Sequence, residues 1–134
     1  MERRDRVIVL DTHAWLWWQT ADEKLSGRAR AEIARADRIG VCTISCYEIA
    51  RATARGRIRL DRDVTSWISQ ALAVGRVEPL ELTHRVATEA GELGSEFPGD
   101  PVDRIIYATA VEHGTRLVTR DRELRRLDPV RTVW

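Results

Sequence analysis

Five acidic residues stand where their side chains could bind a metal ion: Asp11, Glu48, Asp100, Asp103 and Asp121. Each follows a predicted strand or opens a predicted helix. Several carboxylates within a few ångströms of one another cannot all stay ionised unaided, and a divalent cation relieves their repulsion. Ligand sets made only of oxygen favour Mg²⁺ or Mn²⁺. Two such ions roughly 4 Å apart can activate a water and stabilise the leaving oxygen of a phosphate ester.

The elements that must position these acids alternate between strand and helix. This order predicts an α/β fold with three layers, a central parallel sheet of about five strands and helices on both faces. The expected strands are Val7–Leu10, Ile39–Thr43, Val77–Leu82, Arg116–Thr119 and Val130–Val133. The expected helices are His13–Trp18, Ser26–Ala36, Ser45–Arg55, Asp63–Ala73, Arg85–Leu93, one ending near Gly114, and Arg122–Leu127. Because ligands bind at the carboxyl ends of parallel strands, where strand order reverses, the acids are predicted to converge there.

Each acid also has a purely structural interpretation as a helix cap. Asp11 and Asp121 each precede a predicted helix. Ser45 and Glu48 fit a capping box, with the serine as N-cap and the glutamate three residues later. Asp100 is followed by proline, a pattern typical of a helix start. Capping does not require acids, since Ser, Thr and Asn cap as well. Both roles are compatible, because a helix N-terminus favours ionised carboxylates.

Length and composition favour one globular domain over residues 1–134. The chain is 43% hydrophobic and has a net charge of +1, from 22 basic and 21 acidic residues. This balance does not indicate binding of nucleic acid by bulk charge. Spanning a bilayer takes roughly 20 apolar residues, and no run approaches that length. The charged start of the chain argues against a signal peptide, so we expect a cytoplasmic protein without a membrane partner.

Basic residues are almost all arginine, since Lys24 is the only lysine. Several of them cluster around a single acid, Asp61. The cluster contains Arg51, Arg55, Arg57, Arg59 and Arg62. It is consistent either with a solvated helix face or with a surface that grips phosphate, because arginine binds phosphate through two donors.

Cysteine and histidine do not indicate a second catalytic centre. Cys42 and Cys46 form no CxxC motif and have no nearby histidine pair, so buried free thiols are expected rather than a zinc site. His13, His84 and His113 are isolated in the sequence. His84 and His113 are interpreted as structural, and His13, two residues after Asp11, could approach the site, although a packed or capping role is favoured. We therefore expect no histidine general base, and expect a metal to activate the water.

Four ordered blocks of sequence resemble PIN-domain ribonucleases, specifically VapC-type toxins of bacterial type II toxin–antitoxin pairs. The resemblance covers almost the whole chain. The blocks are "VLDTHAWLWW" (9–18), "ISCYEIARATARGRIRL" (44–60), "GDPVDRIIYATA" (99–110) and "LVTRDREL" (117–124). It implies a PIN-like fold in which the catalytic and metal-binding acids are Asp11, Glu48, Asp103 and Asp121.

The same resemblance suggests supporting roles for three neighbours. Asp100 caps a helix and assists the ligands from outside, Thr119 bonds a ligand carboxylate or a metal-bound water, and Arg104 pairs with a site acid or contacts phosphate. Two positions depart from the family pattern. Tyr47 stands where tryptophan is frequent, and Pro98 stands where histidine is frequent. Neither departure touches the four acids.

The implied activity is Mg²⁺- or Mn²⁺-dependent endoribonuclease cleavage, commonly of tRNA or ribosomal RNA. The implied partners are a VapB-like antitoxin, a second copy in a homodimer, and operator DNA reached only through the antitoxin. The alternative is a PIN-fold module that binds RNA or a partner without cutting. A phosphoacceptor receiver or a haloacid dehalogenase-like phosphatase fits poorly. The chain lacks the receiver's paired acids and late lysine, and "DTH" places His13 where the phosphatase needs an aspartate.

Overall fold

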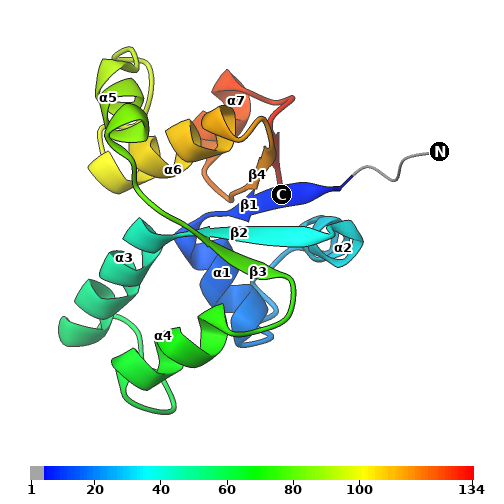
Figure 1. Cartoon of the computed structure of the whole chain (residues 1–134), viewed down its shortest axis with the longest axis vertical. Coiled ribbons are helices and arrows are strands. Elements are labelled where there is room, and N and C mark those ends of the chain that lie inside the picture. The colour runs from blue at the N-terminus through cyan, green and yellow to red at the C-terminus, as the bar shows by residue number, and fades with distance from the viewer. Residues whose placement is uncertain (1–4) are drawn as a thin grey trace.

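The structure is a computed structural model that describes residues 5–134, in which five strands alternate with seven helices (Figure 1). In chain order these are β1 Val7–Leu10, α1 Thr12–Gln19, α2 Gly27–Arg35, β2 Arg38–Cys42, α3 Thr43–Ala54, α4 Val64–Leu72, β3 Val77–Leu80, α5 His84–Glu92, α6 Pro101–Glu112, β4 Arg116–Val118, α7 Arg122–Leu127 and β5 Thr132–Val133. The interpretation of the N-terminus as lacking a signal peptide rests partly on residues 1–4, which lie outside the described residues.

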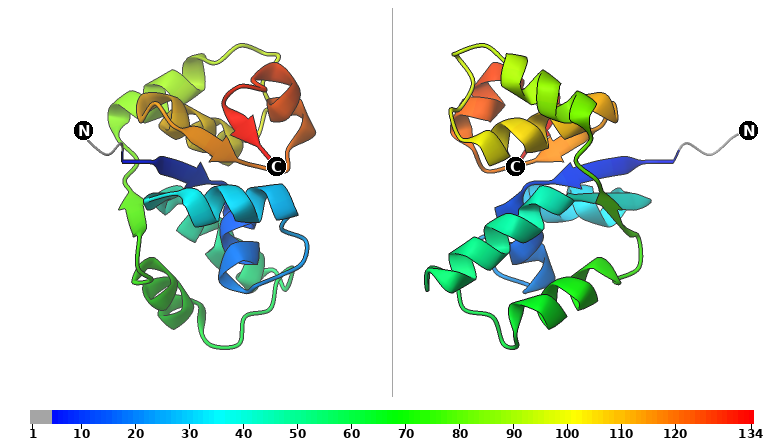
Figure 2. Two further views of the ribbon diagram at one scale, coloured as in Figure 1. Left: turned by 90° about the vertical axis from the view of Figure 1, so that its right-hand side faces the viewer. Right: turned by 60° about the vertical axis from the view of Figure 1, so that its left-hand side comes forward.

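The strands form one parallel sheet in the order β3-β2-β1-β4-β5. Helices α1 to α4 lie on one side of the sheet and α5 to α7 on the other (Figures 1 and 2). The predicted α/β architecture is therefore confirmed. Strand order reverses between β1 and β4, so the crevice that such sheets use for ligands opens at the carboxyl ends of these two strands.

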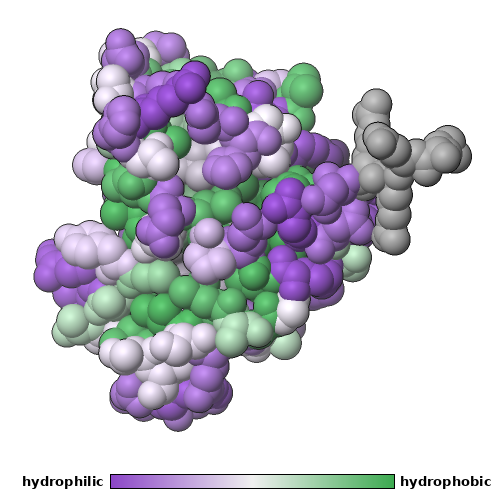
Figure 3. All heavy atoms as spheres, viewed as in Figure 1, coloured by the Kyte–Doolittle hydropathy of each residue, from purple (hydrophilic) through white to green (hydrophobic). Residues whose placement is uncertain are grey.

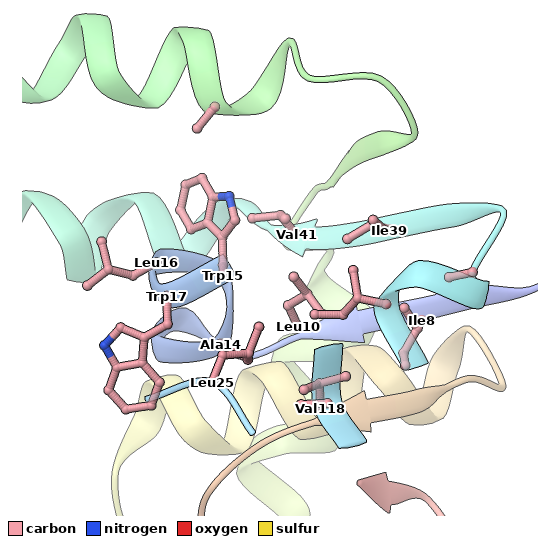
Figure 4. Packing of buried hydrophobic residues seen from close by; sticks show 14 of the residues in the cluster. Ile8, Leu10, Ala14, Trp15, Leu16, Trp17, Leu25, Ile39, Val41 and Val118 are labelled. Atoms are coloured by element: carbon pink, nitrogen blue, oxygen red, sulfur yellow. The ribbon is translucent and has the colours of Figure 1, made fainter. Parts of the chain in front are cut away.

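Successive side chains of β1 point to opposite faces of the sheet, so this short strand contributes to two hydrophobic cores. Ile8 and Leu10 pack toward the side of α1, α2 and α4, whereas Val9 packs toward α6 and α7. All three are at least 96% buried. On the α1 side, Trp15 is fully buried (Figure 4). Its ring lies 5.4 Å from that of Trp67 on α4. This packing anchors α1, and with it the residue that precedes α1, directly against the sheet.

Capping predictions hold for most helices but are wrong for α3. Asp11, Asp100 and Asp121 each cap a helix. Helix α3, however, begins at Thr43 directly after β2, and its N-cap makes no side-chain bond. The predicted capping box fails because the buried hydroxyl of Ser45 is engaged elsewhere. Glu48 therefore lies in the second turn of α3, not the first.

The two edge strands are shorter than predicted, β3 at its carboxyl end and β5 at its start. Strand β2 pairs with β3 only as far as Cys42 with Leu80, since the chain then enters α3. Strand β5 pairs at only two positions, and the backbone before it turns through a hydrogen bond from the Arg131 amide to Asp128 at 3.1 Å. In residues 5–134, none of the helices has the length and apolar composition that a membrane span requires.

Candidate active site

The predicted acids meet in one cavity at the carboxyl end of the sheet. Asp11 follows β1, Asp121 follows β4, Glu48 comes from α3, and Asp103 from the first turn of α6. We call this the acid cavity. Its lining is Asp11, Thr12, His13, Glu48, Asp100, Asp103, Arg120 and Asp121. The convergence predicted from strand order is therefore present, whereas the role of these acids as metal ligands stays a prediction.

Helix starts hold three of these carboxylates in place. Asp11 accepts a hydrogen bond from the Ala14 amide at 2.8 Å. Asp121 accepts one from the Leu124 amide at 3.0 Å, and Asp100 accepts one from the first turn of α6. The positive end of each helix dipole thus lies beside a carboxylate, which favours the ionised form.

Burial and crowding oppose this stabilisation. Burial raises the pKa of Asp11 and of Glu48 above their ordinary values. The pKa of Asp103 rises to about 7, first because of burial and then because of the charges of Asp100, Glu48, Asp11 and Asp121. Carboxylates that repel one another this strongly form a set of oxygen ligands suited to a divalent cation.

Thr119 contacts two of the predicted acids, and its predicted role beside a metal ligand stays a prediction. Its buried hydroxyl hydrogen-bonds the side chain of Asp11, which offsets part of the rise in the pKa of that group. The same hydroxyl accepts a hydrogen bond from the amide of Asp121 at 3.1 Å. Thr119 thus links the two acids that follow neighbouring strands.

Thr12 is a supporting residue that the sequence analysis missed. Its buried hydroxyl donates to the carboxylate of Glu48 and lies 2.9 Å from the hydroxyl oxygen of Ser45, with which it shares a second hydrogen bond. The only sequence signal was its place directly after Asp11. Thr12 fixes the direction of the Glu48 side chain across the junction of α1 and α3.

Replacing Thr12 with valine is expected to lower the free energy of unfolding by about 1–2 kcal/mol, because the isosteric change leaves Glu48 and Ser45 without this partner. Thr12→Ser keeps the hydroxyl and is the matched control. Urea unfolding followed by circular dichroism measures both. Equal stability of the valine and serine variants would contradict the role of the hydroxyl.

In the described part of the chain Arg104 pairs with no site acid and does not line the acid cavity, so the predicted pairing is wrong, whereas its contact with phosphate stays a prediction. Its guanidinium donates to the backbone carbonyls of Ala90 and Pro98, each at 3.1 Å, and to that of Leu93. Ala90 lies in the last turn of α5, whereas Leu93 and Pro98 lie in the segment between α5 and α6, so the guanidinium joins the end of α5 to the segment that leads into α6. Pro98, where the family often has histidine, contributes a backbone acceptor to this arrangement.

His13 was expected to be structural, but its exposed ring lies at the edge of the acid cavity, 5.3 Å from the ring of Trp17. Both cysteines are free thiols, as predicted, and burial raises the pKa of Cys42 to about 11.

Among residues 5–134, no three His, Cys, Asp or Glu side chains already form a complete ligand set around one point. The oxygen donors and the raised pKa of Asp103 nevertheless fit Mg²⁺ or Mn²⁺.

Residues 8–129 match the PIN domain family. The chain belongs to the PIN-domain family. Within it, this PIN domain is 44% identical to Ribonuclease VapC22 of Mycobacterium tuberculosis, over 95% of this chain and 98% of that protein, which places it among VapC proteins.

Two solved structures share the fold of this PIN domain. One is VapC20 of M. tuberculosis, described as a sarcin-ricin loop cleaving toxin, with 18% identity, a TM-score of 0.68 and coverage of 90% of this chain and 94% of that one. The other is a DNA-bound VapBC from Salmonella typhimurium, with 20% identity, a TM-score of 0.67 and coverage of 96% and 97%.

Proposed function

We propose that this VapC protein is a metal-dependent endoribonuclease that hydrolyses RNA phosphodiester bonds and acts as the toxin of a toxin–antitoxin pair. The observation that carries the proposal is the acid cavity, in which Asp11, Glu48, Asp103 and Asp121 arrive from four different elements. Similarity to a protein named a ribonuclease supports RNA as the substrate. Transfer RNA and ribosomal RNA are the proposed targets.

The four acids are the proposed ligands for Mg²⁺ or Mn²⁺. When bound, such ions lower the pKa of a coordinated water and neutralise charge on phosphate oxygens. The chain itself supplies the geometry. The Ala14 amide and Thr119 hold Asp11, and Thr12 holds Glu48, so these carboxylates need little reorganisation when substrate arrives. Asp100 caps α6 and adds negative charge beside Asp103 without being counted among the ligands.

Partners follow from the same proposal. Solved structures with this fold include complexes named VapBC, which supports a VapB-like antitoxin that covers the acid cavity. A homodimer, operator DNA bound through the antitoxin, and a cytoplasmic location complete the proposal.

The test is cleavage of total cellular RNA by the purified protein with Mg²⁺ or Mn²⁺, and with EDTA. Discrete fragments are expected with metal and none with EDTA. Asp11→Asn should remove cleavage while keeping the α1 cap, because asparagine caps as well as aspartate. Asp63→Asn is the matched control, since Asp63 caps α4 in the same way, outside the acid cavity, and should leave cleavage unchanged.

Equal cleavage by the wild type and Asp11→Asn would assign the activity to a contaminant. A folded wild type that binds RNA or antitoxin and never cuts would favour the non-catalytic module instead.

A further inference from the structure

The acid cavity opens into a second hollow along α3, which we call the α3 groove. The two hollows share Thr12, His13, Glu48 and Asp100, so they are continuous. The α3 groove adds residues of α3 and of the loop that follows it, with an apolar floor that includes Leu16. A strand of RNA that reaches the acids from this side would lie in the groove.

Three arginines line this groove: Arg51, Arg55 and Arg57. We call them the arginine row. Arg51 and Arg55 lie three and seven residues after Glu48, which is the spacing of residues on one face of a helix. At a rise of 1.5 Å per residue, the side chains of Glu48 and these two arginines extend over roughly 10 Å along that face. All three arginines of the row are exposed, and within residues 5–134 none of them lies in an ion pair. Their charge is therefore available to a ligand.

A further arginine lines the acid cavity but not the α3 groove. Arg120 lines the acid cavity, and its guanidinium carbon lies 4.6 Å from the ring centroid of Trp17. Trp17 follows Leu16, which lines the α3 groove, but its side chain points about 100° away around α1 and does not line that groove. The ring of Trp17 also packs 5.9 Å from that of Trp134, which fixes the surface under Arg120.

Arg120 makes no ion pair in the described part of the chain, although five carboxylates line the same cavity. A guanidinium that stacks on an indole keeps its N–H donors directed outward. The acid cavity thus has an unpaired cation that directly precedes Asp121 in the chain, and the arginine row lies in the groove that continues from Glu48.

We propose that the arginine row and Arg120 bind backbone phosphates of a single-stranded RNA on the two sides of the bond that is cut. This inference rests on the proposed function and adds the path of the substrate. A single strand is favoured because Tyr47, 58% exposed beside Glu48, and the apolar floor of the groove suit unstacked bases. Cations next to an aromatic ring are the pattern of grooves that hold single-stranded nucleic acid.

Figure 3 shows hydrophobic surface in the lower part of one face, over the region of α3 and α4. A protein segment could also use apolar surface of this kind, so protein binding is an outcome that the experiment must separate from RNA binding.

The test is binding of a fluorescein-labelled, mixed-sequence single-stranded RNA oligonucleotide, measured by anisotropy at several salt concentrations. The full chain is used with Asp103→Asn, so that binding is read without cleavage. The slope of log affinity against log salt is negative, and each of Arg51→Gln, Arg55→Gln and Arg57→Gln should reduce its magnitude by about 0.7, and the triple variant by about 2. The triple variant should bind at least ~10-fold more weakly at low salt.

Arg59→Gln is the matched control, because it removes the same charge from an exposed position nearby that does not line the groove. Its slope should stay unchanged. Arg120→Gln should weaken binding about tenfold, and Arg120→Lys should restore part of it, since lysine keeps the charge without the planar stack.

An unchanged salt slope in the triple variant would overturn the inference. So would normal RNA binding combined with lost retention by a VapB-like antitoxin, which would assign the arginine row to protein recognition. Because binding is measured in a non-cleaving chain, a wild type that fails to cut RNA overturns the proposed function alone.

Discussion

Replacing Asp103 with asparagine is expected to lower RNA cleavage at least ~100-fold and, at the same time, to make the metal-free protein more stable at pH 8. The two effects share one cause. Burial, together with the charges of the neighbouring carboxylates, raises the pKa of Asp103 to about 7. An acid whose pKa is higher in the folded state than in the unfolded state costs folding free energy when it ionises. Asparagine at this position removes both a proposed metal ligand and the folding free energy that ionisation of the carboxyl group costs.

The pH window follows from this sign. Below about pH 4 the carboxyl group is protonated in both states, and the variant and wild type should be equally stable. The cost grows as pH rises and is complete above about pH 7. There the free energies of unfolding of the variant and the wild type should differ by about 2 kcal/mol. This is half of the value that the pKa difference gives, because Asp103 is partly exposed and solvent screens its charge. Mg²⁺ should stabilise the wild type at pH 8 more than the variant.

Urea unfolding at pH 4, 6 and 8, with and without Mg²⁺, measures this difference. Asp63→Asn is again the control. The pKa of Asp63 is lowered by the Ser66 amide, so its replacement should not increase stability at pH 8. An Asp103→Asn protein that gains nothing at pH 8 would show that the acids of the cavity do not repel one another as described.

The second large effect concerns folding alone. Arg104→Gln is expected to lower the free energy of unfolding by about 3 kcal/mol, because one carbonyl in the last turn of α5 and two in the segment before α6 lose a charged donor. That change corresponds to a fall of roughly 10 °C in the melting temperature.

Arg85→Gln is the matched control for Arg104→Gln. Arg85 is an exposed arginine of α5 that makes only surface ion pairs, with Glu89 and Glu112. Its replacement should change stability by less than about 0.5 kcal/mol. Thermal unfolding compares the two variants. Equal melting temperatures would mean that water replaces the guanidinium of Arg104 without cost.

Features that depend on local sequence could be predicted well. Asp11, Asp100 and Asp121 cap helices because a carboxylate before a helical segment finds free amides within three residues. The five-stranded parallel sheet follows from the alternation of elements, and it brings distant acids to one edge. The position of the acid cavity could therefore be inferred from strand order and spacing alone.

Features that depend on contacts between distant segments could not. Ser45 has the sequence context of an N-cap, but Thr12, 33 residues earlier, engages its hydroxyl. Arg104 lies beside the acids in sequence, yet the nearby turn offers it carbonyls 6 to 14 residues away. In both cases the local pattern was ambiguous, and tertiary hydrogen bonding selected the partner.

Because two of the proposed metal ligands, Asp11 and Asp121, also cap helices, the proposed function implies that activity can be lost without unfolding of the protein. Asparagine at Asp11 or Asp121 keeps the hydrogen bond to the helix amide and loses the charge. Codons for aspartate and asparagine differ by a single base, so a folded, catalytically silent form lies one point mutation away at either position. Selection against the activity of this chain would therefore leave inactive but intact proteins, which still present the same surface to any partner.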